Sequence, residues 1–304
     1  MTVGWIGAGR MGAALCHRLL GFGVDLTVYN RTRDKVADLA ELGATLADTP
    51  AKLADRDLVF TMVSDPAAFS EVTTGVEGLF SVPGVTPQIL IDASTVSADV
   101  SEEVRRVAAD RGCQLLAAPV SGNPKVVKSG RLTVVASGPR PAFETARPYL
   151  EMFGEGVSYV GEGDTARLVK ICHNLMLGIV TQTLAETAVL AERAGVSRAD
   201  YMEFINMSVM GSTFTKYKTP AIVNLDFSPS FTGYLLRKDF ELGLEAGRQY
   251  DVPLPTAALV HQMIVAMIGR GHGDEDFMRL LTVEAASSGL ELEPEDVEVD
   301  DGLS

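Results

Sequence analysis

The stretch Trp5-Ile6-Gly7-Ala8-Gly9-Arg10-Met11-Gly12 decides the fold of this chain, because it places Gly-x-Gly-x-x-Gly between an apolar strand and a helix. Gly7 permits the tight turn, Gly9 lets the backbone approach a pyrophosphate, and Gly12 lets the helix pack closely on the strand. The helix N-terminus offers N–H groups and the positive end of its dipole to phosphates. The turn therefore predicts a dinucleotide site made by Gly7, Gly9, Arg10, Met11 and Gly12.

The end of the second expected strand selects the dinucleotide. Sites for NAD usually carry Asp or Glu there, which accepts hydrogen bonds from the ribose hydroxyls. This chain has Asn30-Arg31-Thr32 at that place. Arg31 can pair with a 2′-phosphate, and Asn30 and Thr32 can donate hydrogen bonds to it. The sequence therefore predicts NADP rather than NAD, the alternative being a solvated turn with an incidental arginine.

Two further loops follow apolar strands, and both are expected at the edge of the sheet where such folds bind ligands. The first is Met62-Val63-Ser64-Asp65 and the second is Asp92-Ala93-Ser94-Thr95. We expect Met62, Val63 and Ser64 to belong to the dinucleotide site. Ser94 and Thr95 are expected to contact its nicotinamide end, and Ser97 fits better than Thr95 as the N-cap of the next helix.

Strands and helices alternate over the first ~160 residues. The predicted strands are 3–6, 26–29, 58–63, 89–92, 114–117, 133–137 and 157–160, and the predicted helices are 11–20, 33–42, 50–54, 67–72 and 98–110. Such alternation predicts an α/β fold of Rossmann type, with a doubly wound, mostly parallel sheet.

The pattern changes after Gly161-Glu162-Gly163-Asp164, where only helical stretches follow. They are 165–194, 198–208, 221–224, 235–250, 255–269 and 276–288. Asp164 is expected to cap the first of these helices, and Gly195 to end it. We therefore expect an NADP-binding domain over residues 1–162, an all-α substrate and oligomerisation domain over 163–290, and an acidic tail over 291–304.

Charge narrows the possible partners. The chain of 304 residues has a formal net charge of −14, which makes it a poor binder of nucleic acid or of an anionic membrane surface. Seven acids and no Lys or Arg lie between Glu291 and Ser304, so the tail is expected to be solvated and mobile, a partner-binding role being the alternative.

No apolar run reaches the ~18–20 uncharged residues that a membrane span needs. Three cysteines, expected as packed side chains, and the lack of a leader pattern indicate a reducing interior, so a cytoplasmic location is expected. The four histidines show no metal-ligand spacing with Cys, Asp or Glu, so no metal site is expected.

Four motifs in order resemble the β-hydroxyacid dehydrogenases, a family that includes 3-hydroxyisobutyrate dehydrogenase and tartronate semialdehyde reductase and is related to 6-phosphogluconate dehydrogenase. The resemblance covers residues 3–288. The motifs are the glycine turn with Met11, the run Ala118-Pro119-Val120-Ser121-Gly122-Asn123 continuing to 130–133, Gly163 followed by Lys170 and Asn174, and Phe231 followed by Lys238-Asp239. The resemblance implies hydride transfer between NADP(H) and a small β-hydroxyacid or its semialdehyde.

The resemblance also implies roles for single residues. Ser121, Gly122 and Asn123 would bind the substrate carboxylate, Lys170 would be the general acid/base, Asn174 would orient it or the substrate, and Lys238 would lie close to the same pocket. The residues themselves agree, because Lys170 and Asn174 stand at i and i+4 and share one face of a helix. An ammonium there could protonate the oxygen of a carbonyl that receives hydride. The alternative, a solvated surface lysine, fits less well with its apolar neighbours.

The chain departs from the family pattern at the substrate loop. Ala117 stands where the family usually has Asp, Asn123 replaces a second Gly, and Val126-Val127 replaces a Gly-Ala pair, with Lys125 and Lys128 beside it. These departures predict a substrate pocket that differs from that of the standard family members, while the reaction type is retained.

Two other functions fit the same scaffold. One is an imine reductase, whose members generally carry Asp or Tyr at the position of Lys170, and the other is a non-catalytic NADP-binding sensor or scaffold. Relatives are dimers or tetramers, and Ala185, Ala188 and Ala191 would permit close helix packing in the long helix. A homodimer or homotetramer is therefore expected.

Overall fold

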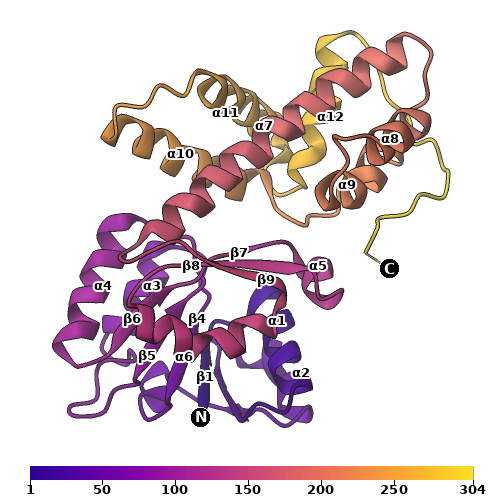
Figure 1. Ribbon diagram of the computed structural model, residues 1–304. Coiled ribbons are helices and arrows are strands. Elements are labelled where there is room, and N and C mark those ends of the chain that lie inside the picture. Colours follow the sequence, from indigo (N-terminus) through magenta and orange to yellow (C-terminus); the bar gives the residue numbers. More distant parts are fainter. Residues whose placement is uncertain (304) are drawn as a thin grey trace. The chain divides into compact units, whose positions relative to one another are not determined.

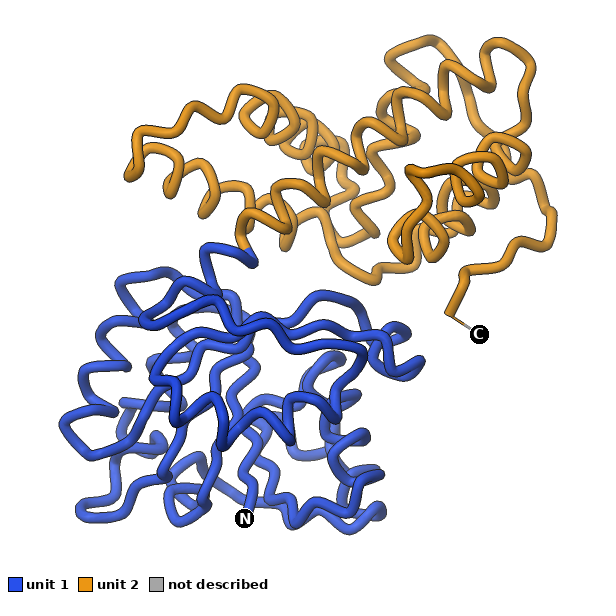
Figure 2. The backbone as a smooth tube through the Cα atoms, in the orientation of Figure 1, with its two compact units in different colours: residues 1–170 blue, residues 171–304 orange. Residues whose placement is uncertain are grey.

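The computed structural model describes residues 1–303, and the chain forms two compact units (Figure 1). Unit 1 comprises residues 1–170 and unit 2 comprises residues 171–304 (Figure 2). The division falls inside the long helix α7 (Thr165–Arg193), whereas the sequence analysis places its domain boundary just before this helix.

The main sheet of unit 1 has six parallel strands in the order β3-β2-β1-β4-β5-β6. Its strands are β1 (Val3–Ile6), β2 (Leu26–Tyr29), β3 (Thr45–Leu46), β4 (Leu58–Thr61), β5 (Ile89–Asp92) and β6 (Gln114–Ala117). The strand order reverses beside β1, which pairs with both β2 and β4. This is the doubly wound arrangement that was predicted, and folds of this kind bind ligands at the carboxyl ends of the strands where the order reverses.

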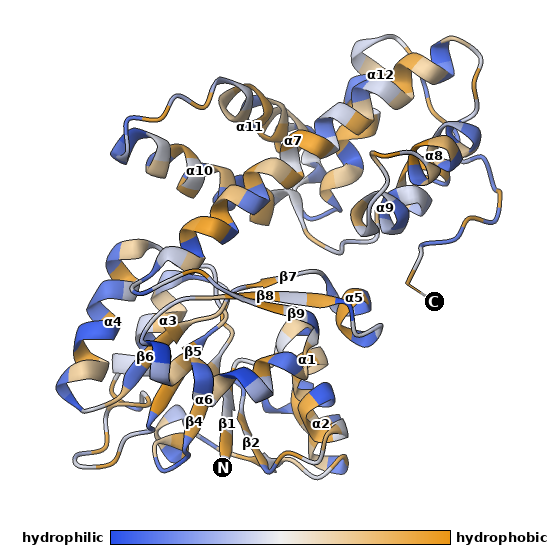
Figure 3. Ribbon diagram, viewed as in Figure 1, coloured by the Kyte–Doolittle hydropathy of each residue, from blue (hydrophilic) through white to orange (hydrophobic). Residues whose placement is uncertain are grey.

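The main sheet is apolar because helices cover both of its faces. They are α1 (Arg10–Gly21), η1 (Arg33–Val36), α2 (Ala37–Glu41), η2 (Pro50–Leu53), α3 (Pro66–Thr74), α4 (Ala98–Asp110) and α6 (Arg140–Glu151), the last of which contacts β5 and β6. Every residue of β1, β4 and β5 is buried, and Figure 3 shows the apolar residues gathered in these strands. Trp5 stacks on Phe60 with ring centroids 5.2 Å apart, which fixes β1 against β4.

A second, three-stranded sheet completes unit 1. It contains β7 (Val120–Ser121), β8 (Leu132–Ala136) and β9 (Gly154–Tyr159), and α5 (Pro124–Lys128) and α6 (Arg140–Glu151) connect its strands. The sequence analysis missed β3, β7, α5 and α6. β3 and β7 are two residues long, too short to show a period, and α6 is interrupted by Pro148.

Unit 2 is helical, as predicted. Besides α7 it contains α8 (Arg198–Met207), α9 (Thr213–Val223), α10 (Gly233–Gln249), α11 (Pro255–Met267), η3 (Ile268–His272), η4 (Phe277–Arg279) and α12 (Leu280–Ser287). The C-terminal half of α7 packs with α8, α9 and α12, and its N-terminal half with α10 and α11. Helix α9 was predicted only over 221–224, because Pro220 interrupts its pattern; a capping box between Ser212 and Thr215 starts it far earlier.

Helix α7 ends as predicted but begins differently. Gly195 has a φ of +90° and the N–H of Val196 donates to the carbonyl of Ala191, the geometry of a glycine helix stop. The carboxylate of Asp164 does not cap the helix start as expected. The N–H of Ala166 donates instead to Ser137 Oγ at 2.9 Å, while Asp164 bonds to side chains.

By length and composition alone, α7 also meets the criteria for a membrane span, with a mean hydropathy of 1.3 over an 18-residue window. The sequence analysis considered only uncharged runs and did not single it out. Core helices of soluble proteins meet the same criteria, and 39% of this window is buried inside the protein, where Leu175 and Leu184 join two apolar clusters.

The acidic tail is mostly exposed, as predicted, but it also docks on the helices of unit 2, which was not predicted. The carboxylate of Glu295 accepts hydrogen bonds from the N–H groups of Arg198 (2.6 Å) and Ala199 (3.0 Å), the first turn of α8. Leu292 and Val299 pack on the core of unit 2. The Arg198 side chain is buried and donates to the carbonyls of Ile222 and Val223 and to that of Glu293 in the tail. The docking was not predicted because the apolar residues of the tail stand singly among its many acidic residues.

The three cysteines are free thiols, and two of them are packed as expected. Cys16 and Cys113 are buried, and burial raises the pKa of the Cys113 thiol to about 12. Cys172 is exposed, so the expectation fails for this residue.

The docked tail gives a stability prediction. Glu295→Ala removes the carboxylate that accepts two N–H groups at the start of α8, while the N-cap Ser197 stays, and it should lower the free energy of unfolding by about 1 kcal/mol, as measured by urea denaturation. Glu298, exposed in the same segment, provides the control, and Glu298→Ala should change it by less than about 0.5 kcal/mol. Equal effects of the two substitutions would contradict a docked tail.

Candidate active site

The glycine turn has the geometry that a pyrophosphate requires. Gly7 has a φ of +92°, and a Cβ there would lie 2.4 Å from the carbonyl oxygen of Met62; a Cβ on Gly12 would lie 2.2 Å from that of Gly7. A Cβ on Gly9 would meet no described atom within 4 Å. Gly9 is the N-cap of α1 and supplies no side-chain hydrogen bond. Bare backbone at a helix N-terminus therefore faces open space, which fits the phosphates of a dinucleotide.

The turn after β2 is tied to the glycine turn by Asn30. Its Oδ1 accepts from the N–H of Ala8 at 3.1 Å, and its Nδ2 donates to the carbonyl of Thr32 at 2.7 Å. Arg31 and Thr32 are exposed beside it. Asn30 thus shapes the turn, and Arg31 and Thr32 are the side chains at the end of β2 that a cofactor phosphate could meet.

A buried carboxylate joins the two loops at the ends of β4 and β5. Asp92 is 0% exposed, and its Oδ1 accepts from Thr61 Oγ1 (2.5 Å) and Ser94 Oγ (2.7 Å). Ser94 Oγ in turn accepts from the N–H of Val63 at 2.9 Å. The loop with Met62, Val63 and Ser64 and the loop with Thr95 therefore lie side by side at one edge of the sheet.

The first turns of α7 reach the same edge through Arg167, which the sequence analysis did not single out. Arg167 is 5% exposed, and its Nη1 donates to the carbonyl of Ser94 (2.8 Å) and lies 2.7 Å from Asp92 Oδ2. Burial alone would lower its pKa, but the carboxylates of Asp92 and Asp164 outweigh burial and raise the pKa above the usual value. Arg167 is therefore a permanent cation, one helical turn before the half-buried Lys170.

The substrate loop predicted from the sequence lies at the end of β7. Gly122 has a φ of +143°, and a Cβ there would lie 2.7 Å from Leu132 Cδ1, so only glycine fits. Asn123 is 7% exposed and its Oδ1 accepts from the N–H of Val126, which caps α5. The Asn123 oxygen is thus used inside the protein, and its amide nitrogen remains the group that could reach an anion beside Ser121.

Unit 2 holds the remaining predicted residues in one small network. Asn174 is 3% exposed, and its Nδ2 donates to Asp239 Oδ2 at 2.5 Å. Lys238 Nζ lies 3.5 Å from the other oxygen of Asp239. His173 is exposed, and its Nδ1 lies 2.9 Å from Asn174 Oδ1. Asp239 therefore fixes the orientation of the Asn174 amide.

The structure thus divides the predicted site residues between the units. Unit 1 carries all the predicted dinucleotide-binding residues, the substrate loop and Lys170, and unit 2 carries Asn174 and Lys238.

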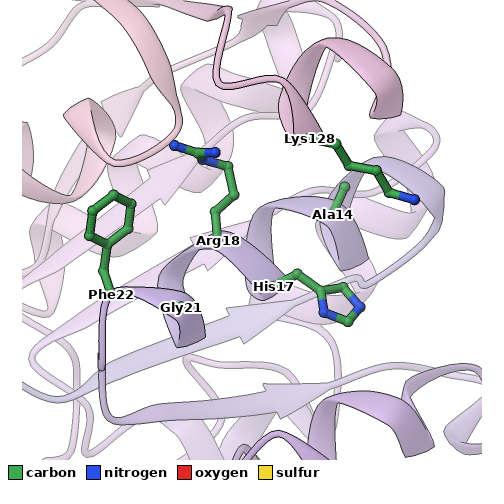
Figure 4. A pocket seen from close by; sticks show the side chains of 6 residues that line it. All are labelled: Ala14, His17, Arg18, Gly21, Phe22 and Lys128. Atoms are coloured by element: carbon green, nitrogen blue, oxygen red, sulfur yellow. The ribbon is translucent and has the colours of Figure 1, made fainter. Parts of the chain in front are cut away.

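A separate hollow of about 600 Å³ lies on unit 1 between α1 and α5 (Figure 4). It is lined by Ala14, His17, Arg18, Gly21, Phe22 and Lys128, none of which belongs to the predicted site. Arg18 has a structural role there, because its Nε donates a hydrogen bond to the carbonyl of Met152 at 2.7 Å. This bond ties α1 to the C-terminal end of α6, and Arg18 Nη1 also donates to the carbonyl of Val127 in α5 at 3.4 Å.

Comparisons with known proteins agree with this architecture. Residues 2–161 match the family of the NAD binding domain of 6-phosphogluconate dehydrogenase, and residues 161–283 match that of the NAD-binding domain of NADP-dependent 3-hydroxyisobutyrate dehydrogenase. The chain is 33% identical over 285 residues to the uncharacterized oxidoreductase YfjR of Bacillus subtilis, covering 92% of this chain and 99% of the relative. It is 30% identical over 287 residues to glyoxylate/succinic semialdehyde reductase 1 of Arabidopsis thaliana, covering 92% and 97%.

Solved structures show the same similarity. The 3-hydroxyisobutyrate dehydrogenase of Salmonella typhimurium superposes with a TM-score of 0.83 at 25% identity, covering 93% of this chain and 99% of that one. Psf3 in complex with NADP⁺ and 2-OPP gives a TM-score of 0.83 at 26% identity, with the same coverage. An imine reductase of Myxococcus stipitatus in complex with NADP⁺ gives 0.60 at 25% identity, covering 92% and 98%.

The sheet, the glycine turn and these matches define an oxidoreductase that binds a nicotinamide dinucleotide. The motifs of the substrate loop and of α7 agree with the matches over both units. The chain belongs to the β-hydroxyacid dehydrogenase family.

Two glycine substitutions should separate cofactor binding from folding. Gly9→Ala adds a methyl group in open space, so the melting temperature should stay within about 2 °C while the Kd for the dinucleotide rises at least about tenfold, as the bare backbone approach is lost. Gly12→Ala places its methyl group against the Gly7 carbonyl and should lower the melting temperature instead. Thermal melts and cofactor fluorescence titrations measure both; unchanged affinity in Gly9→Ala would contradict the assignment of the turn.

Proposed function

We propose that this protein is an NADP(H)-dependent oxidoreductase that interconverts a small β-hydroxyacid and its semialdehyde or keto form. The observation that carries the proposal is the anchoring of α7 at the dinucleotide edge. Arg167 bonds to Asp92 and to the Ser94 carbonyl, and Lys170 follows one turn later on the same helix. An ammonium group thus stands on a rigid element that starts beside the loop expected at the nicotinamide.

The residues divide the reaction between them. The bound dinucleotide would supply or accept the hydride. In the reductive direction Lys170 Nζ donates a proton to the carbonyl oxygen as the carbon receives hydride, and in the oxidative direction the neutral amine takes that proton back. The Ser121 hydroxyl, the backbone at Gly122 and the Asn123 amide nitrogen hold the substrate carboxylate.

Asn174 and Lys238 complete the proposal from unit 2. Asp239 accepts a hydrogen bond from Asn174 Nδ2 and so fixes the orientation of this amide. Lys238, close to the same carboxylate, adds positive charge that favours an anionic substrate. Orientation and a preorganised charged pocket would supply most of the rate enhancement.

Preference for NADP rests on the turn after β2. The exposed Arg31 and Thr32 end that strand where an NAD site would present a carboxylate, and a carboxylate would repel a 2′-phosphate. The complexes of Psf3 and of the Myxococcus imine reductase contain NADP⁺, which supports the same choice.

An imine reductase is the second candidate, because such an enzyme is among the structural neighbours. Its TM-score of 0.60 is well below the 0.83 of the hydroxyacid dehydrogenase structure, and Lys170 with Asn174 matches the latter family. A non-catalytic sensor or scaffold would bind the dinucleotide without turnover. The assay below separates all three.

We propose in addition that the chain forms a homodimer or homotetramer in the cytoplasm. Large apolar side chains are exposed at the end of α8 and after it, including Phe204 (65%), Met207 (73%) and Met210 (71%), and a second copy could cover them. The three free thiols fit a reducing compartment. Light scattering after gel filtration would measure the mass; a monomer would contradict self-association.

Initial rates at 340 nm test the proposed reaction. NADP⁺ and NAD⁺ would be offered with a panel of 3-hydroxy acids, and NADPH with the matching semialdehydes and with cyclic imines. Turnover of hydroxyacids with NADP⁺ is expected. Turnover of imines alone would support the second candidate, and tight NADPH binding with no turnover would support a sensor.

Cofactor choice should depend on Arg31. Arg31→Ala removes the cation expected to pair with the 2′-phosphate and should lower the ratio of kcat/KM for NADPH over NADH by about 10- to 100-fold, the loss typical of a charge-assisted contact. Arg106→Ala, at an exposed arginine on α4, should leave the ratio unchanged. If Arg31→Ala leaves the ratio of kcat/KM for NADPH over NADH unchanged, another group binds the 2′-phosphate.

Proton transfer should depend on Lys170. Lys170→Ala should lower kcat by at least about 10²- to 10⁴-fold, the usual contribution of a general acid/base, while the Kd for NADPH changes little. Lys52→Ala, at an exposed lysine on η2, is the matched control and should keep full activity. A near-normal kcat in Lys170→Ala would contradict the assignment of Lys170 as the general acid/base.

A further inference from the structure

The chemistry proposed above does not use Arg167, yet this residue makes the densest buried polar network in unit 1. Its Nη1 donates to the Ser94 carbonyl and pairs with Asp92, and its Nε donates to Asp164 Oδ1 (3.0 Å) and Ser101 Oγ (3.1 Å). Asp164 also accepts from Arg105 Nη2 at 2.9 Å. One guanidinium therefore joins the end of β5, the start of α4 and the first turn of α7.

Only a planar, forked cation can make these contacts together. The acceptors lie on three different segments, and Nε and Nη1 of Arg167 point to different ones. A lysine ammonium is a single point charge and could keep one or two of them at most. The shape of the guanidinium, and not its charge alone, sets where α7 begins relative to the Asp92–Thr95 loop.

The position of Arg167 also determines the position of Lys170, because both residues lie on the same helix. Residues three apart in an α-helix are separated by about 4.5 Å along the axis and lie near the same face. The backbone between Arg167 and Lys170 is regular α-helix, so a shift at the guanidinium moves the lysine by a similar distance. A displacement of about 1 Å in a reacting group can lower a rate by about 10²-fold.

We propose that Arg167 is a positioning residue for hydride transfer: by bonding Asp92, the Ser94 carbonyl and Asp164, it fixes the turn of α7 that carries Lys170 against the loop that carries Thr95. This inference rests on the proposed function, since it assumes that Lys170 moves the proton. The competing explanation is a buried ion pair that serves folding only, for which loss of one partner lowers stability and nothing else.

The test uses Arg167→Lys in the full-length protein, with Arg198→Lys as the matched control. Arg198 is also a buried arginine bonded to several backbone carbonyls, but it lies in unit 2 and contacts α9 and the tail. Both variants should lose thermal stability. Below both melting temperatures, kcat should fall about 30- to 100-fold in Arg167→Lys, with the Kd for NADPH within about threefold of wild type, and it should stay within about twofold in Arg198→Lys.

A double-mutant cycle shows through which residue Arg167 acts. If it acts by placing Lys170, then Arg167→Lys should reduce the residual rate of Lys170→Ala by less than about threefold, because the group being placed is already absent. A full 30-fold loss in that background, or an unchanged kcat in the folded single variant, would overturn the proposal. Should Arg167→Lys not fold, Ser101→Ala removes one acceptor of Arg167 and the hydrogen bond that Ser101 donates to Asp164, and it should lower kcat about 3- to 10-fold with the same dependence on Lys170.

Amide hydrogen exchange of the NADPH-bound protein keeps the test independent of the substrate. In Arg167→Lys the amides of residues 94–96 and 165–170 should exchange at least about tenfold faster than in wild type, and in Arg198→Lys they should not. If wild type turns over no panel substrate, the proposed function fails, while exchange still reports on the anchoring. Unchanged exchange in Arg167→Lys would overturn the inference whatever the substrate.

Discussion

The buried carboxylate of Asp92 is the constraint on which the candidate site of unit 1 depends. A charge taken out of water is tolerated only when paired and hydrogen-bonded. Asp92 meets this requirement with Thr61, Ser94 and Arg167, and each of these partners belongs to a different part of the site. Satisfying one carboxylate therefore aligns the end of β4, the loop after β5 and the start of α7.

The glycine turn and the Asp92 network solve different problems at the same edge of the sheet. The turn clears space for phosphates, because Gly7 and Gly12 allow close backbone packing and Gly9 stays open. The network then holds the loops beyond the phosphates, where the nicotinamide and the reacting carbon would lie. A fold that many enzymes share thus receives its chemistry from a few side chains at the strand ends.

The features that could be predicted from the sequence are those that depend on residues close together in the chain. The glycine turn, the long strands and the helix stop at Gly195 each depend on neighbouring residues, and the structure confirms them. It missed β3 and β7, which are too short to show a period, and most of α9, whose pattern Pro220 interrupts. The charge of the tail predicted its exposure but not its docking, because the docking depends on Arg198, 97 residues away from Glu295.

The candidate site shows the same limit. Lys170 and Asn174 could be found because their spacing fits one helix face. Arg167 could not, because its partner Asp92 lies far away in the sequence, at the end of β5, and no spacing links the two residues. Asn123 was read as a substrate contact from its position, and only the structure shows that its oxygen caps α5. Pairings between distant segments become visible only once the topology is known.

The central claim is that hydride passes between the nicotinamide and the oxygen-bearing carbon of a small acid, with Lys170 moving the proton. Following deuterium tests it most directly: NADPH deuterated at nicotinamide C4 would be incubated with the panel of semialdehydes and the product acids analysed by mass spectrometry. We predict one deuterium on the new carbinol carbon with wild type, and almost none with Lys170→Ala at equal cofactor occupancy. Product without deuterium, or deuterated product formed equally fast by Lys170→Ala, would contradict it.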